Sequence, residues 1–263
     1  MSKTALITGS SNGIGYELAK IHAEKGDNLV LVARSKSKLD KFKKELEETH
    51  KVAVYTIGKD LSVPGAAAEV YDNLKSKRIS IDYLVNNAGF GDFGLFAESD
   101  WSKQEQMINL NIMALVHFTR LFLTDMLKRG SGKIMNAAST ASFQPGPTMS
   151  VYFATKAFVL SFSQAINEEV RENGITVTAL CAGATHSGFQ STASNQDGKK
   201  FERNKFASSR EVAEFGYRAM MKGKVVAIHG FKNRVLANSV RFGPRSLVVK
   251  MARKTQAKKY FKL

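Results

Sequence analysis

Seven short runs of apolar and β-branched residues alternate with longer segments of helical period. This alternation limits the fold most, because apolar runs separated by helices are typical of parallel strands covered on both faces. The sequence therefore predicts an α/β fold, a doubly wound seven-stranded parallel sheet with helices on both faces. The expected strands are residues 4–9, 28–33, 52–57, 81–86, 132–138, 175–180 and 224–229, and the expected helices are residues 14–25, 36–49, 64–77, 102–129, 151–173 and 209–222.

No linker, repeat or low-complexity segment divides residues 1–230, so we expect them to form a single domain. The polar stretch 186–208 interrupts the alternation between the sixth strand and the next helix. Long insertions of this kind are often lids, and we expect a substrate-binding lid here. Residues 231–263 are predicted to add a basic helical extension, two short amphipathic helices divided at Gly243 and Pro244.

Positive charge is concentrated at the C-terminal end. The formal net charge is +16, and residues 190–263 hold 18 Lys and Arg against 4 Asp and Glu. A basic tail can bind nucleic acid or anionic lipid, although a solvated surface explains the same composition. Because no nucleic-acid motif accompanies the charge, we expect no nucleic-acid partner. Contact with a peripheral membrane or an acidic carrier through the basic C-terminus stays open.

Cysteine and histidine usage points to an intracellular protein without a metal centre. The single cysteine, Cys181, allows no disulfide framework, and the five histidines lack metal-ligand spacing. The N-terminus carries no signal-peptide pattern, and no run of 18 uncharged apolar residues occurs. We therefore expect a cytoplasmic protein that neither is secreted nor spans a membrane.

A glycine-rich turn follows the first expected strand. The segment "TGSSNGIG" places Gly9, Gly13 and Gly15 just before a helix. In a doubly wound sheet this is where backbone N–H groups and a helix N-terminus bind a pyrophosphate. The spacing is G-x-x-x-G-x-G rather than the general dinucleotide pattern, and a tight strand-to-helix connection alone would also favour glycines.

Tyr152 and Lys156 in "SVYFATKAFVL" are four residues apart, so a helix would place both on one face. Taken alone, this pair fits an amphipathic helix better than a catalytic site. Three further features lie at ordered positions along the chain: "NNAG" at 86–89, Asn111 in "LNI", and Ser139, which ends the fifth strand thirteen residues before Tyr152.

These motifs, in this order, resemble the short-chain dehydrogenase/reductase (SDR) family, over about residues 3–230. The segments "ASTASFQPGP" and "YFATKAFV" are most similar to a bacterial subgroup of short-chain oxidoreductases. The resemblance implies a Rossmann fold and four catalytic residues: Asn111, Ser139, Tyr152 and Lys156. One departure is Ala182 in "CAGATHSGF", where the family usually has proline.

The chemistry of carbonyl reduction explains these residue types. A nicotinamide supplies hydride, and by resemblance Tyr152 supplies the proton. A free phenol has a pKa near 10, so we expect the Lys156 ammonium and the nicotinamide charge to lower it. Ser139 is expected to hold the carbonyl oxygen. In the family, Asn111 opens its helix and orders a water that connects Lys156 to solvent; an ordinary polar helix residue is the alternative.

The resemblance also implies a set of cofactor-binding residues. Asp60 and Leu61 match the family's adenine-contacting pair, although Asp60 could instead cap a helix after Ser62. The full set is Gly9, Ser11, Asn12, Gly13, Ile14, Gly15, Arg34, Asp60, Leu61, Asn87, Ala88, Gly89, Tyr152, Lys156, Gly183 and Ser187.

Cofactor choice depends on the end of the second strand. An NAD-preferring fold usually has an acidic residue there, but this chain has Arg34, and no acid follows until Asp40. Arg34 could bind a 2′-phosphate through charge-assisted hydrogen bonds, so we expect NADP(H) rather than NAD(H). A surface arginine is the alternative, and Asn12, where many NADP-dependent relatives are basic, argues slightly against.

The sequence as a whole predicts an NADP(H)-dependent oxidoreductase that interconverts a carbonyl and an alcohol. Apolar residues at 90–96, 143–147 and Phe189 favour a small or apolar substrate, including the 3-oxoacyl type. The alternative is a non-catalytic, cofactor-sensing binding protein on the same fold. Helices 102–129 and 151–173 resemble the family's dimer surface, so a homodimer or homotetramer is expected.

Overall fold

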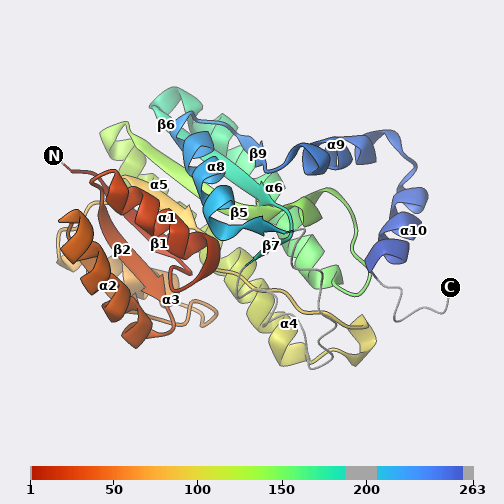
Figure 1. Ribbon diagram of the computed structural model, residues 1–263, viewed down its shortest axis with the longest axis horizontal. Coiled ribbons are helices and arrows are strands. Elements are labelled where there is room, and N and C mark those ends of the chain that lie inside the picture. The colour runs from red at the N-terminus through yellow and green to blue at the C-terminus, as the bar shows by residue number, and fades with distance from the viewer. Residues whose placement is uncertain (1, 187–205, 257–263) are drawn as a thin grey trace.

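The computed structural model describes residues 2–186 and 206–256, and seven strands form one parallel sheet (Figure 1). Its strand order is β3-β2-β1-β4-β5-β6-β9, with the order reversing between β1 and β4. The expected α/β fold with seven parallel strands is confirmed. The strands are β1 (Thr4–Thr8), β2 (Asn28–Ala33), β3 (Val54–Gly58), β4 (Tyr83–Asn86), β5 (Gly132–Ser139), β6 (Ile175–Ala182) and β9 (Val226–Ile228).

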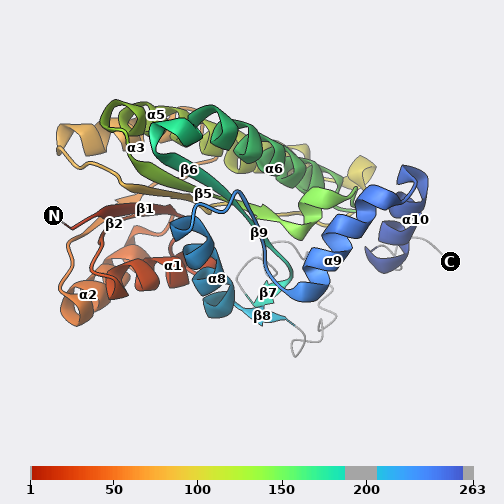
Figure 2. The same ribbon diagram turned by 90° about the horizontal axis from the view of Figure 1, so that it is seen from above.

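Helices cover both faces of the sheet (Figure 2). One layer contains α1 (Gly13–Glu24), α2 (Lys36–His50) and α8 (Ser209–Met221), and the other contains α3 (Ala66–Ser76), α5 (Leu115–Arg129) and α6 (Ser150–Val170). Because both faces are covered, strands such as β2 are apolar at almost every position, with five of its six residues buried. All seven strands being parallel, their carboxyl ends lie at one edge of the sheet.

The expected helix over 102–129 is interrupted. It begins as α4 (Trp101–Ile108), passes through a π-helical segment at Asn109–Ala114 and continues as α5. By length and composition alone, the whole stretch Trp101–Arg129 is long and apolar enough to cross a membrane. Its inward residues, among them Phe118 and Met126, are nevertheless fully buried in the core between this helix and the sheet.

Other differences from the expected elements lie around the insertion and the C-terminus. Two short strands, β7 (Thr185–His186) and β8 (Ala207–Ser208), pair in parallel at either end of the insertion. Residues 187–205, most of the expected lid, lie outside the described part of the chain. The C-terminal extension forms α9 (Phe231–Ser239), a 3₁₀ turn (Val240–Phe242) and α10 (Arg245–Gln256), which confirms two helices divided at Gly243 and Pro244.

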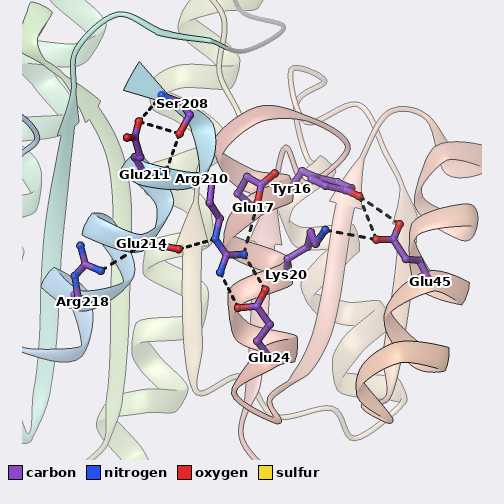
Figure 3. A network of polar contacts seen from close by, with 10 residues as sticks. All are labelled: Tyr16, Glu17, Lys20, Glu24, Glu45, Ser208, Arg210, Glu211, Glu214 and Arg218. Carbon is purple, nitrogen blue, oxygen red and sulfur yellow. Dashed lines mark hydrogen bonds and ion pairs between the residues drawn. The ribbon is translucent and has the colours of Figure 1, made fainter. Parts of the chain in front are cut away.

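Arg210 links α8 to α1 through a network of ion pairs (Figure 3). Its Nη1 and Nη2 each donate to one carboxylate oxygen of Glu24 at 2.8 Å, and its Nε donates to Glu214 at 2.8 Å. Glu17 lies 3.8 Å away. The hydrogen bonds from Arg210 lower the pKa of Glu24 below its usual 4.5. This network therefore joins the helix after the insertion to the helix that begins at the glycine turn.

Replacing Arg210 tests this link. Arg210→Ala should reduce the free energy of unfolding by about 1 kcal/mol near neutral pH, since the network is partly exposed. A carboxyl with a lowered folded pKa stabilises above its unfolded pKa, and this stabilisation is lost as pH falls through the folded value. The difference from wild type in urea unfolding should therefore shrink below a pH of about 4.5. Arg218→Ala, which breaks only a 3.7 Å pair with Glu214 inside α8, is the control. An effect of Arg210→Ala that persists unchanged in acid would contradict the assignment.

Candidate active site

The glycine turn between β1 and α1 packs directly against the loop after β4. Gly9 and Gly13 have φ of +67° and +60°, in the left-handed region that favours glycine. A Cβ on Gly15 would lie 2.4 Å from Asn87 Nδ2 and 2.5 Å from the Gly9 carbonyl oxygen. The turn thus has no room for larger residues, and its backbone lies at the N-terminus of α1, where doubly wound folds bind a pyrophosphate.

Hydrogen bonds from Thr8 and Asn87 join this turn to the β4 loop. The Thr8 hydroxyl accepts from the backbone N–H groups of Asn87 and Ala88, each at 3.0 Å. Asn87 Nδ2 donates to the carbonyl oxygens of Thr8 at 3.0 Å and Gly9 at 3.3 Å. A Cβ on Gly89 would lie 2.9 Å from the side-chain oxygen of Asn111, so this loop also reaches the π-helical segment.

The remaining turn residues lie at the start of α1. Asn12 is the N-cap residue and is exposed, and its side chain makes no capping hydrogen bond. Ser11 and Ile14 on either side are partly buried. The turn therefore offers a ligand the side chain of Asn12 together with backbone groups.

Ser139 ends β5 and begins the 3₁₀ turn Thr140–Phe143. Its hydroxyl accepts from the Ala141 N–H at 3.1 Å and donates to the Ala182 carbonyl on the neighbouring strand at 3.4 Å. A side-chain hydrogen bond also joins Ser139 to Tyr152. The turn is fixed to α6 because Ser142 donates to the Lys156 carbonyl at 2.7 Å. Ser139 is therefore held at the carboxyl edge of the sheet, beside the phenol.

Tyr152 and Lys156 lie one turn apart in α6, on the face turned toward β5. Lys156 Nζ lies 5.8 Å from the centroid of the Tyr152 ring and donates to the Ala137 carbonyl at 2.6 Å. Lys156 is only 6% exposed, an unusual environment for an ammonium. The structure thus brings Ser139, Tyr152 and Lys156 together at one place.

Burial shifts the pKa values of both groups. Desolvation raises the pKa of Tyr152 to about 12, and the Ser139 hydrogen bond works against that rise. Desolvation lowers the pKa of Lys156 to about 8, so Lys156 is still largely an ammonium near neutral pH. The expected lowering of the tyrosine pKa is therefore not produced by the protein groups alone. It needs further positive charge at the phenol, such as an oxidised nicotinamide.

Asn111 lies in the π-helical segment and is 1% exposed. Its side-chain oxygen accepts from the Phe90 N–H at 3.1 Å, while Nδ2 donates to the Phe90 carbonyl at 2.9 Å and to Thr155 Oγ1 at 3.1 Å. These bonds connect the opened helix to the β4 loop and to α6, one residue before Lys156. The helix opens at Asn111, as the family resemblance implied.

The adenine end of the expected site lies at the carboxyl ends of β2 and β3. Arg34 is exposed. Burial opposes the lowering of the Asp60 pKa, which is due mainly to hydrogen bonds from Ser62 and to a smaller extent to the charge of Arg34. Asp60 accepts from the Ser62 N–H at 2.9 Å and hydroxyl at 2.7 Å, whereas α3 begins only after Gly65, so Asp60 does not cap that helix. The Leu61 side chain is 5% exposed and belongs to the core. Of the expected pair, only Asp60 presents its side chain at the surface.

Gly183 follows β6 beside the C-terminal extension. A Cβ there would lie 2.5 Å from Asn233 Nδ2 of α9. Ala182, where the family usually has proline, extends β6 by pairing with Ser139. Ser187 lies outside the described residues. Among the described residues, 2–186 and 206–256, no group of three or more His, Cys, Asp or Glu could hold a metal ion.

Four residues that contribute to this arrangement were not expected from the sequence: Thr8, Ser142, Thr155 and Asn233. Thr8 precedes Gly9 in the quoted glycine motif, and Thr155 precedes Lys156, so their positions offered a signal. Asn233 is fifty residues from Gly183 and lies in the extension, where no motif marks it.

A sequence model of the short-chain dehydrogenase family matches residues 3–198. The chain belongs to that family. The human very-long-chain 3-oxoacyl-CoA reductase is 36% identical over 186 residues, which cover 68% of this chain and 58% of the human protein. This short-chain dehydrogenase thus matches less than two thirds of that relative's length.

Solved short-chain dehydrogenases have the same fold over nearly the whole chain. One from Sphingobium yanoikuyae in complex with NADPH is 31% identical with a TM-score of 0.80, covering 98% of this chain and 100% of that one. The bulky-bulky ketone specific alcohol dehydrogenase from Comamonas testosteroni is 29% identical with a TM-score of 0.78, covering 99% and 97%. The glycine turn of this short-chain dehydrogenase is therefore part of a fold that binds a nicotinamide cofactor.

The close packing at Gly15 gives a direct test of the turn. Gly15→Ala would force Asn87 and the Gly9 carbonyl apart, and should destabilise the protein by roughly 1–3 kcal/mol. It should also weaken binding of the nicotinamide cofactor roughly tenfold or more, because backbone contacts to the charged phosphates are displaced. Thermal unfolding and NADPH fluorescence titration measure the two effects. Gly94→Ala is the control, since a Cβ there meets nothing within 4 Å. Equal losses in both variants would show that the Gly15 contact has no special role.

Proposed function

We propose that this short-chain dehydrogenase is an NADP(H)-dependent enzyme that interconverts a carbonyl and an alcohol on an apolar substrate. The observation that carries the proposal is the buried Lys156 ammonium, 5.8 Å from the Tyr152 ring, with Ser139 hydrogen-bonded to that tyrosine. A binding protein gains nothing from burying a charge beside a phenol, whereas proton transfer needs that arrangement.

The groups divide the reaction between them. A nicotinamide cofactor held at the glycine turn would supply or accept the hydride. The Ser139 hydroxyl, held by the turn at Thr140–Phe143, positions the carbonyl oxygen by a hydrogen bond. Tyr152 donates its phenolic proton to that oxygen during reduction, and Lys156 stabilises the phenolate that remains. Asn111 fixes the β4 loop and Thr155 beside this centre, which keeps the lysine and tyrosine in register.

The preference for NADP(H) rests on this chain's own residues, because solved relatives with this fold contain either NADPH or NAD. Arg34 is exposed at the carboxyl end of β2 and exerts its charge on Asp60. A 2′-phosphate beside β2 would meet a guanidinium there and no carboxylate from the same turn.

An apolar substrate is supported by the loops around the catalytic groups. The loop after β4 and the loop before α6 are joined by a hydrogen bond from the Gly94 N–H to the Thr148 carbonyl at 2.9 Å. Phe96, which is 59% exposed, and Met149 lie where these loops meet, beside polar neighbours that include Asp92 and Gln104. The names of the human and Comamonas relatives, a 3-oxoacyl-CoA reductase and a bulky-bulky ketone specific alcohol dehydrogenase, also fit a 3-oxoacyl-type or bulky ketone substrate.

Oligomerisation is part of the proposal. Large apolar side chains remain exposed on the outer helices of one layer, including Met113 at 59%, Leu127 at 41% and Phe158 at 41%. These helices, 101–129 and α6, are those expected to form a homodimer or homotetramer. Sedimentation showing only monomer would contradict this part.

Tyr152→Phe tests the catalytic assignment. Turnover should fall roughly 10²–10⁴-fold because the proton donor is lost, while NADPH affinity should stay nearly unchanged. The assay is NADPH oxidation with a panel of ketones, aldehydes and 3-oxoacyl thioesters. Tyr55→Phe, which removes an exposed hydroxyl 2.9 Å from Asn73, is the control. If the wild type binds NADPH but turns over no compound, the cofactor-sensing alternative is favoured.

Arg34→Ala tests the cofactor preference. Wild type should bind NADPH more tightly than NADH, and the variant should lose roughly tenfold to a hundredfold in NADPH affinity while keeping its NADH affinity, because charge-assisted hydrogen bonds are removed. Fluorescence titration measures both. Arg171→Ala is the control, because Arg171 lies at the C-terminal end of α6, away from Tyr152 and Lys156 near its N-terminal end. A wild type with equal or tighter NADH binding would show that Arg34 does not select the cofactor.

A further inference from the structure

The extension made of α9, the 3₁₀ turn and α10, residues 231–256, exposes an unusual number of large apolar side chains. Phe242 is 89% exposed and Phe231 is 80% exposed. Thirteen large apolar residues in the described chain are exposed, and seven of them lie in this extension. The seven are Phe231, Val235, Leu236, Phe242, Leu247, Val249 and Met251. So dense an exposed apolar surface marks an interaction site.

The same extension is strongly basic. Residues 231–263 contain ten Lys and Arg and no Asp or Glu. Within the described chain, six of these cations are joined to no carboxylate by an ion pair: Lys232, Arg234, Arg241, Arg245, Lys250 and Lys254. By contrast, Arg210 in α8 pairs with several acids. The extension thus combines unneutralised positive charge with exposed apolar groups.

The two kinds of side chain share one face of α10. Leu247 and Met251 are four residues apart, as are Lys250 and Lys254, so the two pairs form adjacent rows along the helix. Ala252 is buried on the other side. Lysines beside an apolar row can extend their ammonium groups to lipid headgroups while their stems and the apolar side chains enter the interface.

A cavity of about 220 Å³ lies between α9, α6 and β9. Three cations, Lys224, Arg234 and Arg241, line it together with apolar groups that include Phe143 and Leu160, and none of the described residues of its lining is acidic. This combination suits the phosphate and adjoining chain of an anionic lipid.

The extension lies close to the candidate active site. Because β9 is parallel to the other strands, α9 begins at the carboxyl edge of the sheet. The Asn233 side chain of α9 lies against Gly183, where it leaves no room for a Cβ. Figures 1 and 2 both show α9 and α10 at the end of the molecule opposite the N-terminus. A surface bound to the extension would therefore lie near the substrate side.

We propose that α9 and α10 dock this short-chain dehydrogenase on an anionic membrane surface. Charge favours a membrane over a second copy, because two extensions without a single acid would repel each other. Exposed phenylalanines favour it over an acidic carrier protein, which would match the charge and leave the apolar groups in water. Docking goes beyond the proposed function and does not depend on it.

Co-flotation of the full-length protein with lipid vesicles tests the proposal, without cofactor or substrate. The protein should bind vesicles of phosphatidylglycerol with phosphatidylcholine, and binding should weaken with added salt. Vesicles of phosphatidylcholine alone should bind it far less. Failure of this binding would overturn the docking proposal and leave the catalytic one intact, since NADPH turnover is measured separately.

Two variants separate the apolar and electrostatic contributions. The combination of Phe231→Ser and Phe242→Ser should raise the half-saturating lipid concentration at least roughly tenfold, because two side chains leave the interface. Replacing three lysines should weaken binding roughly a hundredfold, at about fivefold per charge. The three are Lys232→Gln, Lys250→Gln and Lys254→Gln.

Matched controls remove the same kinds of group elsewhere: Val63→Ser with Trp101→Ser for apolar surface, and Lys25→Gln, Lys41→Gln and Lys44→Gln for charge. Both controls should bind vesicles nearly as wild type does, and all variants should retain the thermal unfolding transition of wild type as evidence of folding. The proposal is overturned if controls and extension variants behave alike. It is also overturned if the extension variants change the sedimentation coefficient, which indicates a second copy, or if acyl carrier protein binds where vesicles do not.

Discussion

The double hydrogen bond from the Asn87 and Ala88 N–H groups to the Thr8 hydroxyl joins the two halves of the doubly wound sheet. It lies where the strand order reverses, between β1 and β4, and the Asn87 side chain adds bonds to the Thr8 and Gly9 carbonyls. Strands that diverge at this point leave a crevice in such folds. Because Thr8 and Asn87 join the glycine turn to the β4 loop by hydrogen bonds, the two segments keep fixed positions relative to each other.

The buried ammonium of Lys156 is held by contacts from the neighbouring strand, turn and π-helical segment. A charge that is 6% exposed is tolerated only when nearby dipoles stabilise it, and the Ala137 carbonyl 2.6 Å away at the end of β5 is one. Ser142 holds α6 at its Lys156 carbonyl, and Asn111 holds the preceding Thr155. The lysine therefore keeps its charge near neutral pH although burial lowers its pKa to about 8.

Local patterns in the sequence predicted the parts that depend on local physics. Apolar periodicity located all seven strands, and i, i+4 spacing placed Tyr152 and Lys156 on one helix face. Side-chain burial depends on distant packing, so the sequence alone did not show that Leu61 is in the core or that Asn233 contacts Gly183. Residue spacing also did not show the burial of the Tyr152 phenol, which raises its pKa to about 12 in the protein alone; the lowering expected with a bound nicotinamide stays a prediction.

The position of the C-terminal extension follows from the parallel topology. In a sheet whose strands all run one way, any segment after the last strand emerges at the carboxyl edge, where ligands bind. The chain leaves β9 at Ile228 and begins α9 at Phe231, so it has no length in which to travel elsewhere. An extension on this fold therefore lies beside the candidate active site, and its surface chemistry affects what can approach that edge of the sheet.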